Sequence, residues 1–174
     1  TAPPAPLDAF QHLHATLRIS RSVIVQPSVY GTDNRTTLAA CDSTPQMRAI
    51  VVVDEDTPPS TLAAYRKRGA VGCRVNMLFG SNARIDSLSS LAGRVGDQGW
   101  HLQILGDVSA LGDRMDEFAS LPVPVVFDHF GHLQAIRGIN DPGFRGLLRL
   151  LGSGAAWVKL SGAYRLGPAG AQTD

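Results

Sequence analysis

Short apolar runs recur along the chain at a nearly regular spacing. Each is rich in Val, Ile and Leu, a composition typical of strands that are buried on both faces of a parallel sheet. The runs cover residues 22–26, 48–53, 71–76, 101–105, 123–128 and 156–160. We therefore expect six parallel strands.

Helical patterns lie between these runs, with apolar residues in steps of three and four. The clearest stripes cover residues 7–17, 85–95 and 144–151. Asp141 followed by Pro142 predicts an N-cap and first turn for the last of these helices. Ser60 is expected to cap another helix, which stops at Gly69.

The alternation of strand and helix predicts right-handed β-α-β units within one α/β domain that spans residues 1–174. Periodicity leaves two architectures open, a doubly wound sheet and most of an eight-stranded barrel. No strand is followed by Gly-x-Gly-x-x-Gly, and no phosphate-binding Gly-x-x-x-x-Gly-Lys-Ser/Thr occurs. A nucleotide-binding doubly wound fold is therefore disfavoured.

Composition narrows the classes of partner. Hydrophobic residues make up 44% of the chain and charged residues 18%, with a formal net charge of +1. This balance does not favour nucleic acid as a partner, and no apolar run approaches the ~20 residues of a membrane span. Cys41 and Cys73 form no Cys-x-x-Cys motif. We expect a reducing compartment, and hence a cytoplasmic location.

The strand ends carry the candidate chemistry. Asp128 and His129 stand where the fifth run ends, just before Gly131. Polar groups at the carboxyl ends of parallel strands are typical of active sites in α/β enzymes, so we favour a catalytic His129 over a purely structural Asp-His pair. Arg74 lies inside an apolar run, so it must either be paired or bind an anion. Arg165, in a loop after the sixth run, is solvated on the simplest interpretation.

The other histidines give less indication of a functional role. His101 shares a strand face with Gln103 and is expected to be structural. His12 and His14 look like a metal-binding His-x-His motif, but they lie in the first predicted helix. Side chains two positions apart on a helix point about 200° apart, so this pair cannot share a metal ion. We expect no metal ligands within this chain.

Several segments taken in order resemble the amidohydrolase superfamily, in the branch that contains 2-pyrone-4,6-dicarboxylate lactonase and related sugar lactonases. They are VQPSVYGTDN at 25–34, GCRVN at 72–76, WHLQ at 100–103, DHFG at 128–131 and VKLSGAYR at 158–165. The first and last are long and specific, whereas the middle ones are weak alone. The resemblance covers nearly the whole chain.

This resemblance implies a partial (β/α)8 barrel, with the six strands as strands two to seven of the family fold. His129 then matches the catalytic histidine of the sixth strand. The family's His-x-His strand and its eighth-strand aspartate have no counterpart here, so the chain is expected to be a fragment that is inactive alone. The second and seventh strands would be open, apolar edges, which favours low stability or association into a homo-oligomer.

The function implied by the resemblance is hydrolysis of a carboxylated lactone such as 2-pyrone-4,6-dicarboxylate, within the degradation of aromatic compounds. His129 would polarise the carbonyl group and stabilise the oxyanion. His132 stands where the related lactonase has arginine, so a monoacid or a sugar lactone stays open as an alternative to a dicarboxylate substrate. The implied substrate-binding residues are Arg74, Arg165, Ser28, Tyr30, Gln103 and His132.

Two alternatives stay open. One is a metal-dependent amidohydrolase or decarboxylase of the same superfamily, which would use Zn or Mn. The other is a truncated barrel without catalytic activity. The lactonase interpretation requires no cofactor, and its partner is a small carboxylate or lactone.

Overall fold

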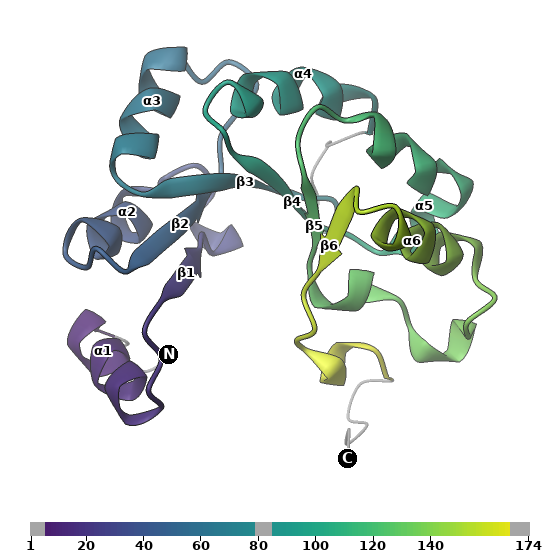
Figure 1. Cartoon of the computed structure of the whole chain (residues 1–174), viewed down its shortest axis with the longest axis horizontal. Coiled ribbons are helices and arrows are strands. Elements are labelled where there is room, and N and C mark those ends of the chain that lie inside the picture. The colour runs from purple at the N-terminus through teal and green to yellow at the C-terminus, as the bar shows by residue number, and fades with distance from the viewer. Residues whose placement is uncertain (1–5, 79–84, 168–174) are drawn as a thin grey trace.

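The computed structural model describes residues 6–78 and 85–167, in which six parallel strands form one sheet in the order β1-β2-β3-β4-β5-β6. The strands are β1 (Ser22–Val25), β2 (Met47–Val51), β3 (Ala70–Asn76), β4 (His101–Leu105), β5 (Val125–Phe127) and β6 (Ala156–Val158). Each strand pairs with its neighbour in sequence, and the sheet curves into an arch (Figure 1). The fold is therefore a partial (β/α)8 barrel, as expected.

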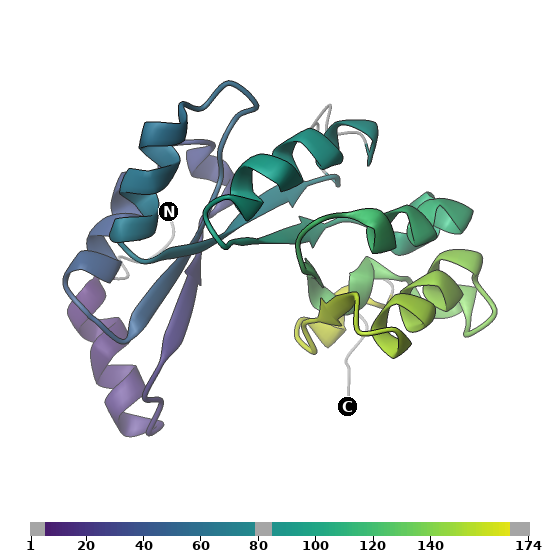
Figure 2. The same ribbon diagram turned by 45° about the horizontal axis from the view of Figure 1, so that its top comes forward.

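The helices cover the outer, convex side of this arch (Figure 2). The α-helices are α1 (Leu7–Thr16), α2 (Arg35–Asp42), α3 (Pro59–Lys67), α4 (Ile85–Gly96), α5 (Val108–Leu111) and α6 (Pro142–Gly152). The 3-10 segments are η1 (Ser28–Tyr30), η2 (Gly112–Ser120), η3 (His129–His132), η4 (Ala135–Arg137) and η5 (Ala163–Arg165).

The hydrophobic core lies between the sheet and these helices. Ile104 of β4 and Phe127 of β5 point outward into it and have no measurable exposure. They belong to one buried cluster with Leu88 of α4 and Leu147 of α6. Because successive side chains of a strand alternate between faces, the other set of strand residues is left on the concave face.

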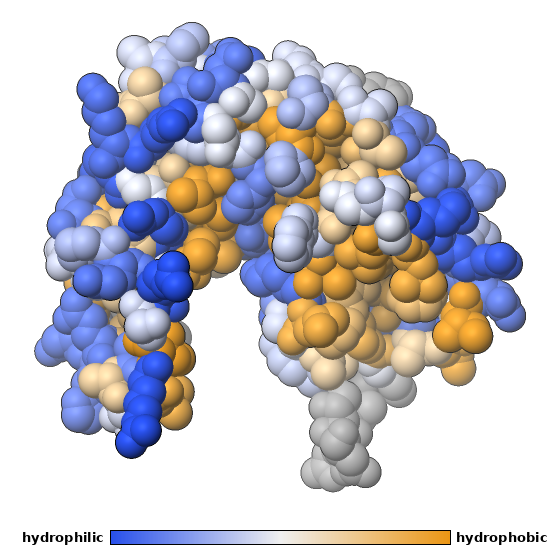
Figure 3. Space-filling view, in the orientation of Figure 1, coloured by the Kyte–Doolittle hydropathy of each residue, from blue (hydrophilic) through white to orange (hydrophobic). Residues whose placement is uncertain are grey.

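Both edge strands of the sheet carry exposed apolar side chains. Val23 of β1 is 54% exposed and Trp157 of β6 is 68% exposed. Helix α1, beside β1, buries none of its residues. Figure 3 shows apolar surface along both inner sides of the arch. The expected open, apolar edges are therefore present.

The helix ends test the capping predictions. Asp141 caps α6 as expected, because its carboxylate accepts hydrogen bonds from the backbone N–H groups of Gly143 and Phe144. The prediction for Ser60 is wrong, since α3 already begins at Pro59 and Pro58 precedes it without a side-chain cap. Proline suits the first helical turn because it has no N–H to be satisfied there.

Two further expectations concern the helices. His12 and His14 lie in α1, as predicted. Within the described residues, no helix combines the length and the apolar character needed to cross a bilayer.

Candidate active site

The register of the sheet brings the polar strand residues together on the concave face. Arg74 of β3 lies opposite Gln103 of β4, which lies opposite Val126 of β5, and Val126 in turn lies opposite Trp157 of β6. Asp128 and Lys159 stand two positions after Val126 and Trp157, so they project from the same face one step nearer the carboxyl ends. Four polar side chains from four consecutive strands therefore converge.

The Asp128 carboxylate is the centre of this cluster and is only 2% exposed. Gln103 donates from Nε2 to both carboxylate oxygens, at 3.1 and 2.9 Å. The Lys159 ammonium lies 2.7 Å from Oδ1, and Nε of Arg74 lies 3.9 Å from Oδ2. Arg74 is thus paired inside its apolar strand, and the buried carboxylate is surrounded by donors, as a buried charge requires.

Arg74 is also tied to the first strand. Its Nη1 donates to the backbone carbonyl of Gln26, directly after β1, at 3.0 Å. The Gln26 side chain is itself buried, and it donates to the carbonyls of Gly31 and Asp33 and accepts from the Thr37 hydroxyl. The loop after β1 is therefore organised around Gln26, and the position of the Arg74 guanidinium depends on it.

Burial lowers the pKa of the Arg74 guanidinium, and Asp128 opposes this effect while the positive charge of Arg165 adds to it. Arg165 lies on η5, is exposed, and stacks over its neighbour Tyr164 with 5.1 Å from Cζ to the ring centroid. Its charge reaches Arg74, so the two guanidinium groups that the sequence singled out belong to one electrostatic environment.

His129 follows Asp128 and begins a turn with unusual backbone geometry. His129, Phe130, Gly131 and His132 have φ angles of 49°, 56°, 70° and 52°. Side-chain-bearing residues rarely adopt this left-handed region, and such strain is concentrated at functional sites. Two bonds hold the turn: the N–H of Phe130 donates to the carbonyl of Lys159, and the N–H of Gly131 donates to that of Asp128.

The turn places His129 close to Ser161, after the end of β6, and His132 beside His129. Nδ1 of His129 lies 3.0 Å from the Ser161 hydroxyl oxygen, and its ring centroid lies 5.2 Å from that of His132. His132 is 9% exposed, and its Nε2 has no hydrogen-bond partner. Burial lowers the pKa of His132, and the charges of His129 and Arg165 lower it further against the opposing effect of Asp128 and Asp107. His132 is therefore neutral at pH 7, unlike an arginine.

Ser28 and Tyr30 occupy a different part of this end of the sheet. Both lie on η1, the single turn after β1, and both are exposed. The structure shows no contact between them and the Asp128 cluster, so their role as substrate contacts stays a prediction. Gln103, Arg74, His129, His132 and Arg165 do come together around Asp128 or its neighbours.

The predicted site residues did not include Asp128, which organises the cluster, or Lys159, its partner. A signal for both was present, since each is a charged residue at the end of an apolar strand. The sequence did not show that two different strands would place their charges within hydrogen-bonding distance.

Other reactive groups are unsuited to catalysis. Burial raises the pKa of the Cys73 thiol to about 12, so this residue is not a thiolate nucleophile at neutral pH. Among the described side chains of residues 6–78 and 88–167, no three or more of His, Cys, Asp and Glu gather in a group that could hold a metal ion.

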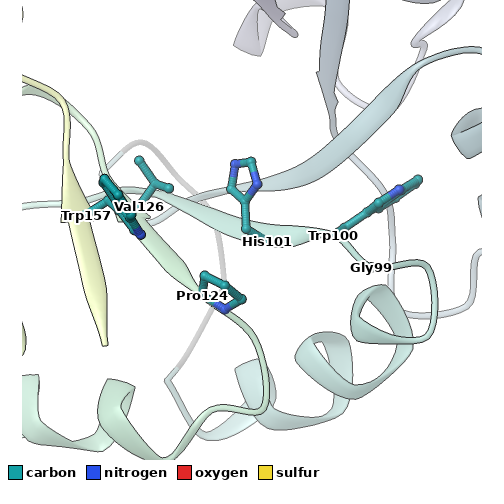
Figure 4. Close-up of a pocket in the computed structure, with 6 residues that line it drawn as sticks. All are labelled: Gly99, Trp100, His101, Pro124, Val126 and Trp157. Carbon is teal, nitrogen blue, oxygen red and sulfur yellow. The ribbon is translucent and has the colours of Figure 1, made fainter. Parts of the chain in front are cut away.

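A cavity of about 320 Å³ lies toward the amino ends of β4, β5 and β6, and its lining includes no member of the Asp128 cluster. Figure 4 shows its lining residues, Gly99, Trp100, His101, Pro124, Val126 and Trp157. The lining is largely apolar and aromatic and includes no permanently charged side chain. Because the catalytic groups of (β/α)8 barrels stand at the carboxyl ends of the strands, we place the candidate site at Asp128 and His129.

Comparison with known proteins supports the description of the fold as a partial (β/α)8 barrel. The family model for amidohydrolases matches residues 1–174. The 4-sulfomuconolactone hydrolase of Hydrogenophaga intermedia is 32% identical over 173 residues, which are 95% of this chain and 56% of that protein.

Two solved structures are also similar. One, from Pseudomonas putida, is assigned as a 2-pyrone-4,6-dicarboxylic acid hydrolase; it has a TM-score of 0.86 and 35% identity, over 97% of this chain and 63% of that one. The other, from Acinetobacter baumannii, carries the same assignment and has citric acid bound; its TM-score is 0.83 at 30% identity, over 98% and 67% of the two chains.

The chain spans only 52 to 60% of the length of the curated relatives that it matches. This share agrees with the expectation that its six strands correspond to part of the family barrel.

Proposed function

The chain belongs to the amidohydrolase family, and we propose that the full-length protein is a hydrolase that opens a lactone bearing an anionic group, such as 2-pyrone-4,6-dicarboxylate. The observation that carries this proposal is the charge around His129. Three cationic groups lie here: Arg74 and Lys159 contact the Asp128 carboxylate, and the charge of Arg165 acts on Arg74. The excess of positive charge favours an anionic ligand. The relatives named as lactone hydrolases support the reaction class.

In the proposed reaction, the arginines bind the substrate and His129 acts on the lactone carbonyl. Guanidinium groups bind carboxylates through paired N–H donors, so the exposed Arg165 is suited to hold a substrate carboxylate, with Arg74 behind it. His129 hydrogen-bonds Ser161 through Nδ1, which leaves its Nε2 to interact with the lactone carbonyl as negative charge develops on the oxygen. Most amidohydrolases add a divalent metal, but the described residues of this chain form no site for one. We assign no step to a metal.

The neutral His132 bears on the choice of lactone. An uncharged imidazole offers a weaker contact to a carboxylate than an arginine does, because it carries no positive charge and at most one N–H, whereas a guanidinium can donate two parallel N–H bonds. We infer that a lactone with one strongly bound anionic group, including a sulfonate, is accepted as well as a dicarboxylate.

A lactone panel assayed with the full-length protein tests this function. Ring opening of 2-pyrone-4,6-dicarboxylate is expected, with kcat/KM reduced by roughly 10²–10³-fold in His129→Ala, because a group that stabilises the oxyanion is lost. Arg74→Met is expected to raise KM, whereas Arg149→Met, on the exposed surface of α6, should change neither constant. Activity that survives chelation identifies a metal-independent lactonase, and activity lost on chelation favours the metal-dependent alternative. Absence of turnover with every lactone would contradict the proposal.

Gly162 offers a second test of the site. It has φ +68°, and a Cβ there would lie 2.9 Å from Nδ1 of His129 and 3.1 Å from Cδ of Arg165. We expect Gly162→Ala to displace both side chains and to lower kcat/KM by about 10- to 100-fold. The matched control is Gly154→Ala, which has φ +76° but open space around it.

Both Gly162→Ala and Gly154→Ala should lose about 1 kcal/mol of stability from the left-handed backbone alone. Only the first should lose activity. Equal activity in the two variants would show that Gly162 does not control the position of His129.

A further inference from the structure

Of the two cations that contact Asp128, Lys159 is more open to solvent than Arg74. Its side chain is 36% exposed, compared with 13% for Arg74 and 2% for Asp128. An ammonium group carries three N–H donors, and one contact at 2.7 Å to Asp128 accounts for one of them. The others are available on the concave face, beside the turn that carries His129.

Arg74 is placed differently. Its Nη1 donates to the carbonyl of Gln26, and its Nε faces Asp128. This Nε has no hydrogen-bond partner, so its contact with Asp128 is a long ion pair. The Arg74 side chain is nevertheless only 13% exposed, and Lys159 is the more accessible of the two cations that contact Asp128.

We propose that Lys159 is a specificity-determining residue of this site, and that its ammonium, held in place by Asp128, binds an anionic group of the substrate. The proposal rests on the proposed lactone hydrolase function and adds a residue that recognises the charge of the lactone. Asp128 acts here as a positioning residue, because it acts on the substrate through Lys159.

Two observations support the positioning. A lysine side chain has about 2 kcal/mol of rotamer entropy to lose when it is fixed. The buried Asp128 carboxylate, itself fixed by Gln103, already restricts the ammonium before any substrate arrives. In addition, the backbone carbonyl of Lys159 accepts the N–H of Phe130, which is adjacent to His129. The ammonium of Lys159 and the imidazole of His129 thus lie on two backbone segments that are joined by a direct hydrogen bond.

The test compares two substrates in the full-length protein. One is a carboxylated lactone, 2-pyrone-4,6-dicarboxylate, and the other is the uncharged 2-pyrone. For Lys159→Met we expect KM for the carboxylated lactone to rise about ten- to a hundredfold, the range of one charge-assisted hydrogen bond. Kinetic constants for the uncharged lactone should change less than about twofold. Lys159→Arg should recover part of the loss, since it keeps the charge.

The chain supplies a matched control, because Lys67 is its only other lysine. Lys67 is exposed in the last turn of α3, and Lys67→Met should leave both substrates unaffected. If Lys159→Met instead lowers activity toward both lactones in the same proportion, Lys159 has a structural role and the inference is wrong, although the proposed function stands.

A binding measurement separates this inference from the proposed function. If the wild-type protein opens no lactone, the proposed function fails, and titration calorimetry with citrate then decides about Lys159. Weaker citrate binding in Lys159→Met than in both wild type and Lys67→Met would support an anion site at Lys159. Equal citrate affinity in the three proteins, or none in the wild type, would overturn it.

Discussion

The Asp128→Asn variant of the full-length protein is expected to lose about 3 kcal/mol of its free energy of unfolding, because removal of one partner from a buried ionic cluster leaves the other charges uncompensated. Arg74 keeps only its contact with the Gln26 carbonyl, and Lys159 loses its carboxylate. The new amide would also present N–H donors where Gln103 donates now. Urea denaturation measures the loss.

Asp116→Asn is the control for this experiment. Asp116 pairs with Arg149 at 2.9 Å, but the two side chains are 58% and 53% exposed. An exposed ion pair contributes about 1 kcal/mol or less, because water and salt screen it. A loss in Asp128→Asn no larger than that in Asp116→Asn would mean that the buried cluster does not stabilise this end of the sheet.

The Gly143→Ala variant is expected to be at least as unstable as Asp128→Asn, with a loss of about 3 kcal/mol or failure to fold. A Cβ at this position in α6 would overlap the backbone carbonyl of Val108 and come within 3.0 Å of Cα of Ser109. Backbone atoms cannot rotate away as a flexible side chain does, so the contact between α6 and α5 would have to open. Thermal unfolding followed by circular dichroism measures the effect.

Gly93→Ala in α4 is the matched control, since nothing lies within 4 Å of the position that its Cβ would take. Alanine favours a helix over glycine by about 1 kcal/mol, so this variant should be slightly more stable than wild type. If Gly143→Ala unfolds at the same temperature as Gly93→Ala, the close approach of α6 to α5 is not a constraint on the fold.

The strands could be predicted because the sequence pattern that specifies each strand lies within the strand itself. An apolar run rich in β-branched residues predicts a buried strand wherever it lies, and all six runs became strands with small shifts of their ends. The segment between β4 and β5 was not predicted, although it forms α5 and η2. Its helix is four residues long and continues as a 3-10 segment, so it is too short for a clear apolar stripe.

The site was predictable only in part. His129 and Arg74 stood out because a polar residue at the end of an apolar strand, or inside one, needs a specific reason to be there. The 3.9 Å contact between Arg74 and Asp128 joins residues that lie 54 positions apart in the chain. No local pattern specifies such a pair, because it depends on the register of two strand pairings, β3 with β4 and β4 with β5.

By itself, the sequence determined the alternation of strands and helices, the apolar stripes of the helices, and which polar residues stand at strand ends. These follow from side-chain periodicity and from the cost of burying polar groups. Only the tertiary structure decided that Asp128 collects Gln103, Lys159 and Arg74, and that His129 begins a left-handed turn toward Ser161. The reason is that curvature and register of the sheet set the distances between strands, and these are properties of the assembled fold.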